Sequence, residues 1–153
     1  MKKKLTLVIL GLAVGLVPTI GAAFDPIDDA EVVCTNYAEE GSIAIDFDEG
    51  VVWAMPRLPD GKVADSYKMN TIRFERGRCP GCYLIETQGI KKFAGMPGYD
   101  ISKQPIVRME VKSKLSPTGK LSETTLNSTY FDLETGEVAP GWRNIRCEAN
   151  EPI

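Results

Sequence analysis

The sequence predicts an all-β fold, a small antiparallel sandwich or barrel of about eight strands that is stapled by disulfides. Three observations carry this prediction. Turn signals built on glycine and proline recur at short intervals along the chain. Between them, apolar and polar residues alternate with a period of two, which is typical of a half-buried strand. The chain also has four cysteines, an even number, as a disulfide framework requires.

Acidic and glycine-containing turns delimit the first half of the predicted sheet. Residues 42–48 alternate so that Ile43, Ile45 and Phe47 share one face. Residues 46–50 (DFDEG) carry acids at alternate positions, as calcium loops do, but they lack the third acid and the distal glutamate. An acidic hairpin turn is therefore predicted there. Strands are expected at about 31–35, 42–47, 51–55, 62–66 and 70–76.

The second half of the chain shows the same alternation. Within residues 106–115, Val107, Met109, Val111 and Leu115 share a face. Residues 124–133 are rich in threonine, tyrosine and phenylalanine, which suit a pleated surface. Strands are expected at about 82–88, 105–115, 122–133 and 142–147. This patterning does not distinguish a sandwich from a barrel.

The first 23 residues have the layout of a secretory signal peptide. Three lysines precede a short apolar run, and small residues end it at Gly21-Ala22-Ala23. The alternative is a membrane anchor, but the run falls short of the roughly 20 residues that span a bilayer. We therefore expect cleavage before Phe24, a single exported β domain over 24–153, no membrane span after cleavage, and a periplasmic or secreted location. Losing three lysines takes the net charge from −3 to −6.

The cysteines are expected to form two disulfides, because an exported chain meets an oxidising environment. Cys34 opens the first predicted strand and Cys147 closes the last, so a bond between them would tie the two ends of the fold. Cys79 and Cys82 would then pair locally. Swapped pairings and a zinc site of four thiolates are the alternatives.

The stretch RCPGCY, residues 78–83, is interpreted as the tip of a β-hairpin. Its flanks have strand patterns, and Pro80-Gly81 has the residue order of a type II turn. A disulfide there would clamp the hairpin. The alternative is a redox centre, in which Arg76 and Arg78 stabilise a thiolate; thioredoxin-type enzymes, however, place this motif at the start of a helix.

Several chemistries are disfavoured by what the sequence lacks. There is no histidine, and so no Ser-His or Cys-His nucleophile pair. There is also no glycine-rich phosphate loop and no c-type haem motif. We expect no cofactor, no metal site and no catalytic residue, although a carboxylate pair for sugar hydrolysis is not recognisable from spacing alone. The acidic mature chain also argues against nucleic acid as a partner.

Charge is unevenly distributed, with a basic centre between acidic ends. Two interpretations are open. Acidic and basic strands neutralise one another across the sheet, or the basic residues form a docking surface for a protein or an anionic envelope component. Under the second interpretation, the candidate binding residues are Arg73, Arg76, Arg78, Tyr83, Lys91, Lys92 and Tyr99. The two tyrosines are expected to be exposed, and Trp53 is expected to lie in the core.

The sequence thus favours a non-catalytic binding or structural domain that presents the clamped tip to a partner, including an inhibitor-like form of such a domain. Two alternatives stay open. The first is a thiol-disulfide exchange protein that uses Cys79 and Cys82. The second is a small-ligand carrier, which needs an open barrel, because a filled interior would leave no room for a ligand.

Overall fold

A computed structural model describes residues 27, 29–38, 41–56, 66–119 and 121–150. The predicted signal peptide, residues 1–23, lies outside the described residues and stays a prediction. The same holds for residues 62–65 of the strand predicted at 62–66, and Ser66 itself precedes a strand. Within the described part of the chain there are nine strands and two short 3-10 helices.

The strands follow the predicted segments closely, with one addition. The additional strand is β8, for which no alternating pattern exists, and the last strand begins at Ile145 rather than at residue 142. The 3-10 helices η3 (Lys91–Phe93) and η4 (Ile101–Lys103) both lie in the connection between β5 and β6. The strands are β1 (Val32–Asn36), β2 (Gly41–Asp46), β3 (Val51–Pro56), β4 (Tyr67–Arg76), β5 (Cys82–Ile90), β6 (Ile106–Leu115), β7 (Leu121–Phe131), β8 (Val138–Pro140) and β9 (Ile145–Ala149).

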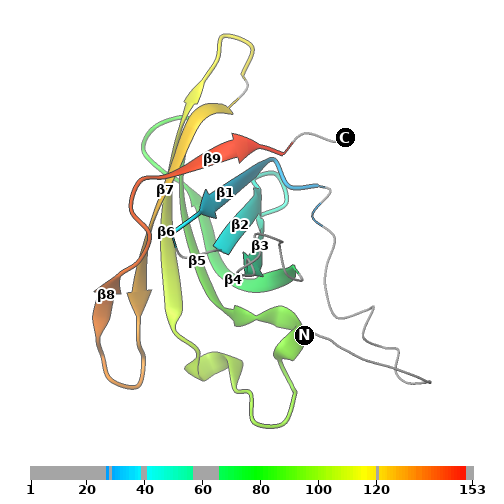
Figure 1. The fold of residues 1–153 in the computed structure, drawn as a ribbon, viewed down its shortest axis with the longest axis vertical. Helices are drawn as coiled ribbons and strands as arrows, with labels where there is room; N and C mark the ends of the chain where they lie inside the picture. Colours follow the sequence, from blue (N-terminus) through cyan, green and yellow to red (C-terminus); the bar gives the residue numbers. More distant parts are fainter. Residues whose placement is uncertain (1–26, 28, 39–40, 57–65, 120, 151–153) are drawn as a thin grey trace, which may run out of the picture.

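The sheet is a closed antiparallel barrel, which decides between the two architectures that the sequence allowed. Neighbouring strands follow the order β6-β5-β4-β3-β2-β1-β9-β7, and a further pairing of β6 with β7 completes a ring of eight. Strand β8 stays outside the ring and pairs only with the end of β7, beside which it lies in Figure 1. Closure removes the open edges at which a sheet would pair with other chains.

The main core fills much of the barrel interior. Ile45 on β2 and Val52 on β3 are register partners, and both are fully buried. Ile85, Met109 and Leu126 join the same cluster from β5, β6 and β7, so its members come from all around the ring. The inward face predicted for residues 43, 45 and 47 is confirmed.

A second, smaller core lies on the outer face of β2 and β3. Ala44 and Trp53 are register partners on this face, and Ala30 and Met55 pack with them. Trp53 is therefore a core residue, as expected, although it lies outside the barrel. Alternation puts Ala44 on the face opposite Ile43 and Ile45, and this face is buried too, because this part of the sheet is covered on both sides.

The Cys34–Cys147 disulfide closes the barrel between the first and last strands. The two cysteines are register partners on β1 and β9, and their bond joins positions 113 residues apart. Only three residue pairs join β1 to β9. The disulfide therefore reinforces a short strand pairing in the ring. It joins the first and last strands, as predicted.

The Cys79–Cys82 disulfide spans the turn between β4 and β5, so the predicted clamped hairpin is confirmed. The predicted turn type is wrong, because Gly81 is not among the glycines with positive φ that a type II turn requires. Gly81 serves instead for close approach. A side chain there would collide with the backbone carbonyl of Ser113, whose N–H donates to the Gly81 carbonyl at 2.8 Å.

Candidate functional site

The barrel interior is not completely filled. A cavity of about 280 Å³ lies inside the end of the barrel at which β3 and β7 end and β4 and β6 begin. Its wall includes Met69, Val107 and Met109, and Tyr130 and Trp142 also line it. Tyr130 is 37% exposed, which places it where the cavity meets solvent. The size falls between an engineered cavity of about 150 Å³ that binds benzene and a typical ligand pocket.

The lining that the structure describes is mostly apolar, and none of the residues described there is charged. Methionine side chains are flexible and polarisable, so Met69 and Met109 can adapt to the shape of a bound molecule. An apolar wall favours an apolar occupant, because such a surface gains free energy when it leaves water. Chemically, the arrangement suits binding rather than catalysis.

Trp142 reaches the cavity because the chain before β9 is fastened to β7. Its backbone N–H donates to the Ser128 hydroxyl at 2.8 Å, and its carbonyl accepts from the Ser128 N–H at 2.9 Å. The guanidinium of Arg143 donates to the Ser128 carbonyl at 2.6 Å. Gly141 permits this contact, because a side chain at that position would collide with Ser128 and with the ring of Tyr130.

Thr87 contributes an unpaired polar atom to this apolar site. It lies on the inner face of β5, lines the cavity and is 1% exposed. Its hydroxyl is one of two buried side-chain polar atoms without a hydrogen-bond partner among the described residues; the other is the indole N–H of Trp53. Buried polar groups are ordinarily hydrogen-bonded, so an orphaned hydroxyl on a residue that lines a cavity calls for an explanation.

Aromatic side chains close the opposite end of the barrel. Phe47, in the turn between β2 and β3, packs on Tyr83 with ring centroids 4.4 Å apart, and Phe74 packs against both. Tyr83 is consequently half-buried rather than exposed, as is Tyr99, whose hydroxyl accepts from the N–H of Ile90 at 2.7 Å. These packed rings fill the end of the barrel opposite the cavity, and none of them is among the residues that line it.

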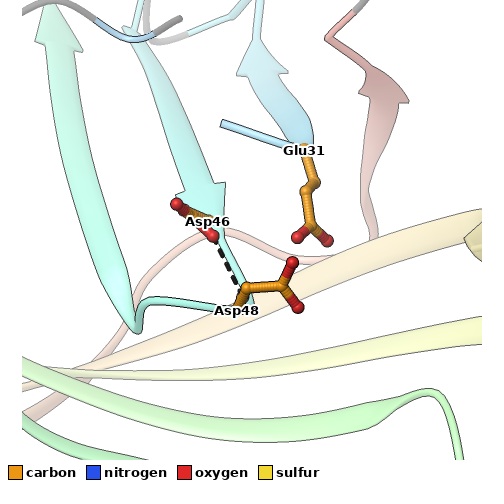
Figure 2. A group of neighbouring side chains, drawn as sticks. All are labelled: Glu31, Asp46 and Asp48. Atoms are coloured by element: carbon orange, nitrogen blue, oxygen red, sulfur yellow. Dashed lines mark hydrogen bonds between the residues drawn. The ribbon is translucent and has the colours of Figure 1, made fainter. Parts of the chain in front are cut away.

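A carboxylate cluster lies at the aromatic end. It consists of Glu31, Asp46 and Asp48, each of which has one carboxylate oxygen within 4.8 Å of those of the other two (Figure 2). One oxygen of Asp46 accepts from the N–H groups of Asp48 and Glu49, at 3.0 and 3.1 Å. The residues 46–50 therefore form the predicted acidic hairpin turn. Carboxylates are ligands that Ca²⁺ accepts, but these contacts already explain the position of Asp46.

The carboxylate cluster should make the free energy of unfolding depend on pH. Burial raises the pKa of Glu31 above its usual 4.5, and the charges of Asp48 and Asp46 raise it further. An ionised Glu31 therefore destabilises the fold, and this cost grows as pH rises from 4.5 through the raised pKa. We expect Glu31→Gln to increase the free energy of unfolding at neutral pH by less than about 1 kcal/mol, because the site is partly exposed.

Urea denaturation of the Glu31→Gln variant and the wild type, at neutral pH and well below pH 4.5, measures this effect. The gain should vanish at the acidic pH. Glu148→Gln serves as the control, because Glu148 is exposed and outside the cluster. A gain of equal size at both pH values would contradict the electrostatic explanation.

The predicted binding residues fall into two groups at opposite ends of β5. Arg76 and Arg78 are exposed near the hairpin tip, where the guanidinium of Arg76 lies 5.7 Å from the ring centroid of Tyr83. Lys91 and Lys92 are exposed in η3, at the far end of β5, with Tyr99 in the same connection. The eight residue steps of β5 span about 26 Å, so these side chains do not form one patch.

Ion pairs across the strands neutralise part of the basic centre. Glu86 on β5 has Arg73 and Arg108 on either side, at 3.8 and 2.7 Å. Arg73 also pairs with Glu75 at 2.6 Å, and Lys114 on β6 pairs with Glu123 on β7 at 2.7 Å. The Arg73 guanidinium therefore forms ion pairs with carboxylates of its own sheet.

A larger hollow, of about 620 Å³, lies on the outer surface of β1 and β9. None of its lining residues is buried, and several are charged. The lining of this hollow is partly polar and at least partly exposed throughout, whereas half of the twelve described residues that line the interior cavity are buried and the lining there is mostly apolar. The interior cavity is therefore the better candidate for a binding site.

Sequence reasoning identified some of the cavity wall but not its role. Val107 and Met109 were predicted on one face of a strand, which is the inner face of β6. Met69 and Thr87 were not singled out for the site. A threonine within a strand pattern carries no signal that its hydroxyl lacks a partner, because that depends on what the opposite wall supplies.

Comparison with models of protein families, with curated proteins and with solved structures found no match to this chain. In the part of the chain that the structure describes, no helix has the length and apolar character needed to cross a membrane. The fold and the site together define a closed eight-stranded barrel with an apolar interior cavity.

Proposed function

We propose that this protein is a non-catalytic carrier that binds a small, mostly apolar molecule inside its barrel. The observation that supports this best is the apolar cavity of about 280 Å³ at one end of the barrel. A carrier needs a preformed concave site, and this one is held by a ring of paired strands and a disulfide. An exported location fits the two disulfides, which persist in oxidising compartments.

Titration with naphthalene tests the proposal, because its two fused rings match the size and apolar character of the cavity. Ligands of about ten heavy atoms bind with a Kd on the order of 100 µM when each atom contributes about 0.5 kcal/mol. Quenching or transfer of tryptophan fluorescence at Trp142 reports the binding. Absence of saturable binding up to the solubility limit would contradict the proposal.

The setting of Cys79 does not support the thiol-exchange alternative. Cys79 lies in the turn between β4 and β5, and Cys82 is the first residue of β5, so neither cysteine is at a helix N-terminus that could stabilise a thiolate. The short loop and the contact between Gly81 and Ser113 hold the turn in place. These features favour a structural clamp.

The hairpin tip supports a second candidate function, docking to an anionic envelope component. Arg76, Arg78, Cys79 and Pro80 are all exposed there. The disulfide holds this turn in one shape, so little conformational freedom is lost when a partner binds. This function does not exclude the carrier function, because the tip and the cavity lie at opposite ends of the barrel.

Co-sedimentation with vesicles that contain phosphatidylglycerol tests the docking function. Replacing Arg76 and Arg78 together by glutamine should weaken vesicle binding by about 10- to 30-fold, because each cation near an anionic surface contributes about 1 kcal/mol. The matched control is Lys91→Gln with Lys92→Gln, which removes two cations from the other end of β5. Equal losses in both variants would show that the tip has no special role.

A further inference from the structure

The unpaired hydroxyl of Thr87 indicates which molecules the cavity takes. Its Oγ1 is buried, has no hydrogen-bond partner among the described residues and belongs to a residue that lines the cavity. A hydroxyl in this state has lost its bonds to water without replacing them. In the protein without ligand, the desolvation of this hydroxyl is uncompensated. A ligand group that forms the missing hydrogen bond therefore gains binding free energy.

Other buried hydroxyls near the site differ from Thr87 in this respect. Ser42 lines the cavity although it lies on the outer face of β2 with Ala44, and its hydroxyl is 2.9 Å from the Thr35 hydroxyl. Thr124, on the inner face of β7, lies 2.7 Å from the Ser113 hydroxyl. The Ser128 hydroxyl accepts from Trp142. Each of these hydroxyls thus has a partner, whereas the Thr87 hydroxyl has none among the described residues.

The rest of the wall restricts the charge of the ligand. Thr87 shares the cavity lining with Met69, Val107 and Met109, and no residue that the structure describes in this lining is charged. An ionised group would lose its hydration there without gaining a counter-ion. A neutral polar group loses less hydration free energy and gains a hydrogen bond to Thr87, whose hydroxyl can both donate and accept.

Resting on the proposed carrier function, we propose that the ligand is a neutral molecule with an apolar body of about two fused rings and one hydrogen-bonding group that pairs with Thr87. The body lies against the methionines, and the polar group points toward β5. A buried polar group in a site discriminates strongly against analogues that leave it unpaired.

Three probes of one shape test this inference: naphthalene, 2-naphthol and 2-naphthoate. For the wild type, we expect 2-naphthol to bind about 10-fold more tightly than naphthalene, and 2-naphthoate to bind more weakly than either. Thr87→Val keeps the shape and removes the hydroxyl, so it should abolish the preference for 2-naphthol while naphthalene still binds. Thr87→Ser should retain the preference.

The matched control is Thr124→Val, the same substitution at an interior threonine that is already paired and does not line the cavity. It should leave the preference unchanged, and thermal melts establish that each variant is folded. A 2-naphthol preference that survives in Thr87→Val would overturn the inference while the carrier function stands. Failure of all three probes to bind the wild type would overturn the carrier function and the inference together.

Discussion

Replacing Cys34 and Cys147 together by alanine should lower the free energy of unfolding by about 4–5 kcal/mol. The bond joins residues 113 positions apart in the sequence. Its removal therefore gives the unfolded chain many more conformations and raises its entropy. It also joins β1 to β9 where only three residue pairs hold the ring closed. Urea denaturation followed by tryptophan fluorescence measures the loss.

The second disulfide supplies the matched control. Cys79 and Cys82 are three residues apart, so the same entropy relation assigns their bond only about 2 kcal/mol. The Cys79→Ala, Cys82→Ala variant should therefore unfold at a higher urea concentration than the Cys34→Ala, Cys147→Ala variant. Equal losses, or the reverse order, would show that loop length does not govern the contribution of the disulfides.

Replacing Ala54 by phenylalanine should weaken the binding of naphthalene by about 100-fold, provided that the ligand lies inside the barrel. Ala54 lines the cavity from β3, and a ring there occupies space that the ligand needs. A ligand that loses about 100 Å² of buried apolar surface loses about 2.5 kcal/mol, which is close to 100-fold in Kd. The same fluorescence titration measures the change.

Ala149→Phe is the control for this experiment, because it adds the same ring at an exposed position. Ala149 pairs with Val32 at the end of the barrel opposite the cavity. The control should bind naphthalene as the wild type does. Unchanged binding in the Ala54→Phe variant would place the ligand outside the cavity and contradict the carrier function.

Local patterns predicted the parts of this fold that local chemistry determines. Alternation assigned Ile43 and Ile45 to the face that lines the interior, because the strand period alone sets which side chains share a face. The pairing of Cys34 with Cys147 followed from the two ends of the sheet and the even number of cysteines. The strand patterns on both sides of CPGC correctly predicted a hairpin rather than a helix start.

Features that depend on contacts between distant segments escaped prediction. Closure of the ring by β6 and β7 is set by the whole sheet, since strand patterns do not specify which edges meet. Strand β8 has exposed residues and ends at Pro140, so it lacks alternation. Gly81 is required by the approach of Ser113, 32 positions further along the chain, rather than by the turn itself.

The candidate site was the part hardest to predict from the sequence, for the same reason. The cavity exists because the inward side chains do not fill this end of the barrel. How much they fill depends on the summed volumes of side chains from six strands and from the segment before β9. Trp142 was assigned to a strand, whereas hydrogen bonds to Ser128 turn it inward. Charge drew attention to the arginines and lysines, although Arg73 is engaged in ion pairs.

A crystal structure determined under xenon pressure tests the central claim most directly, because xenon enters dry apolar cavities without requiring a particular ligand. The carrier function predicts a bound xenon atom inside the barrel among Met69, Val107 and Met109. A barrel in which side chains occupy that space, with no xenon in the interior, would contradict it.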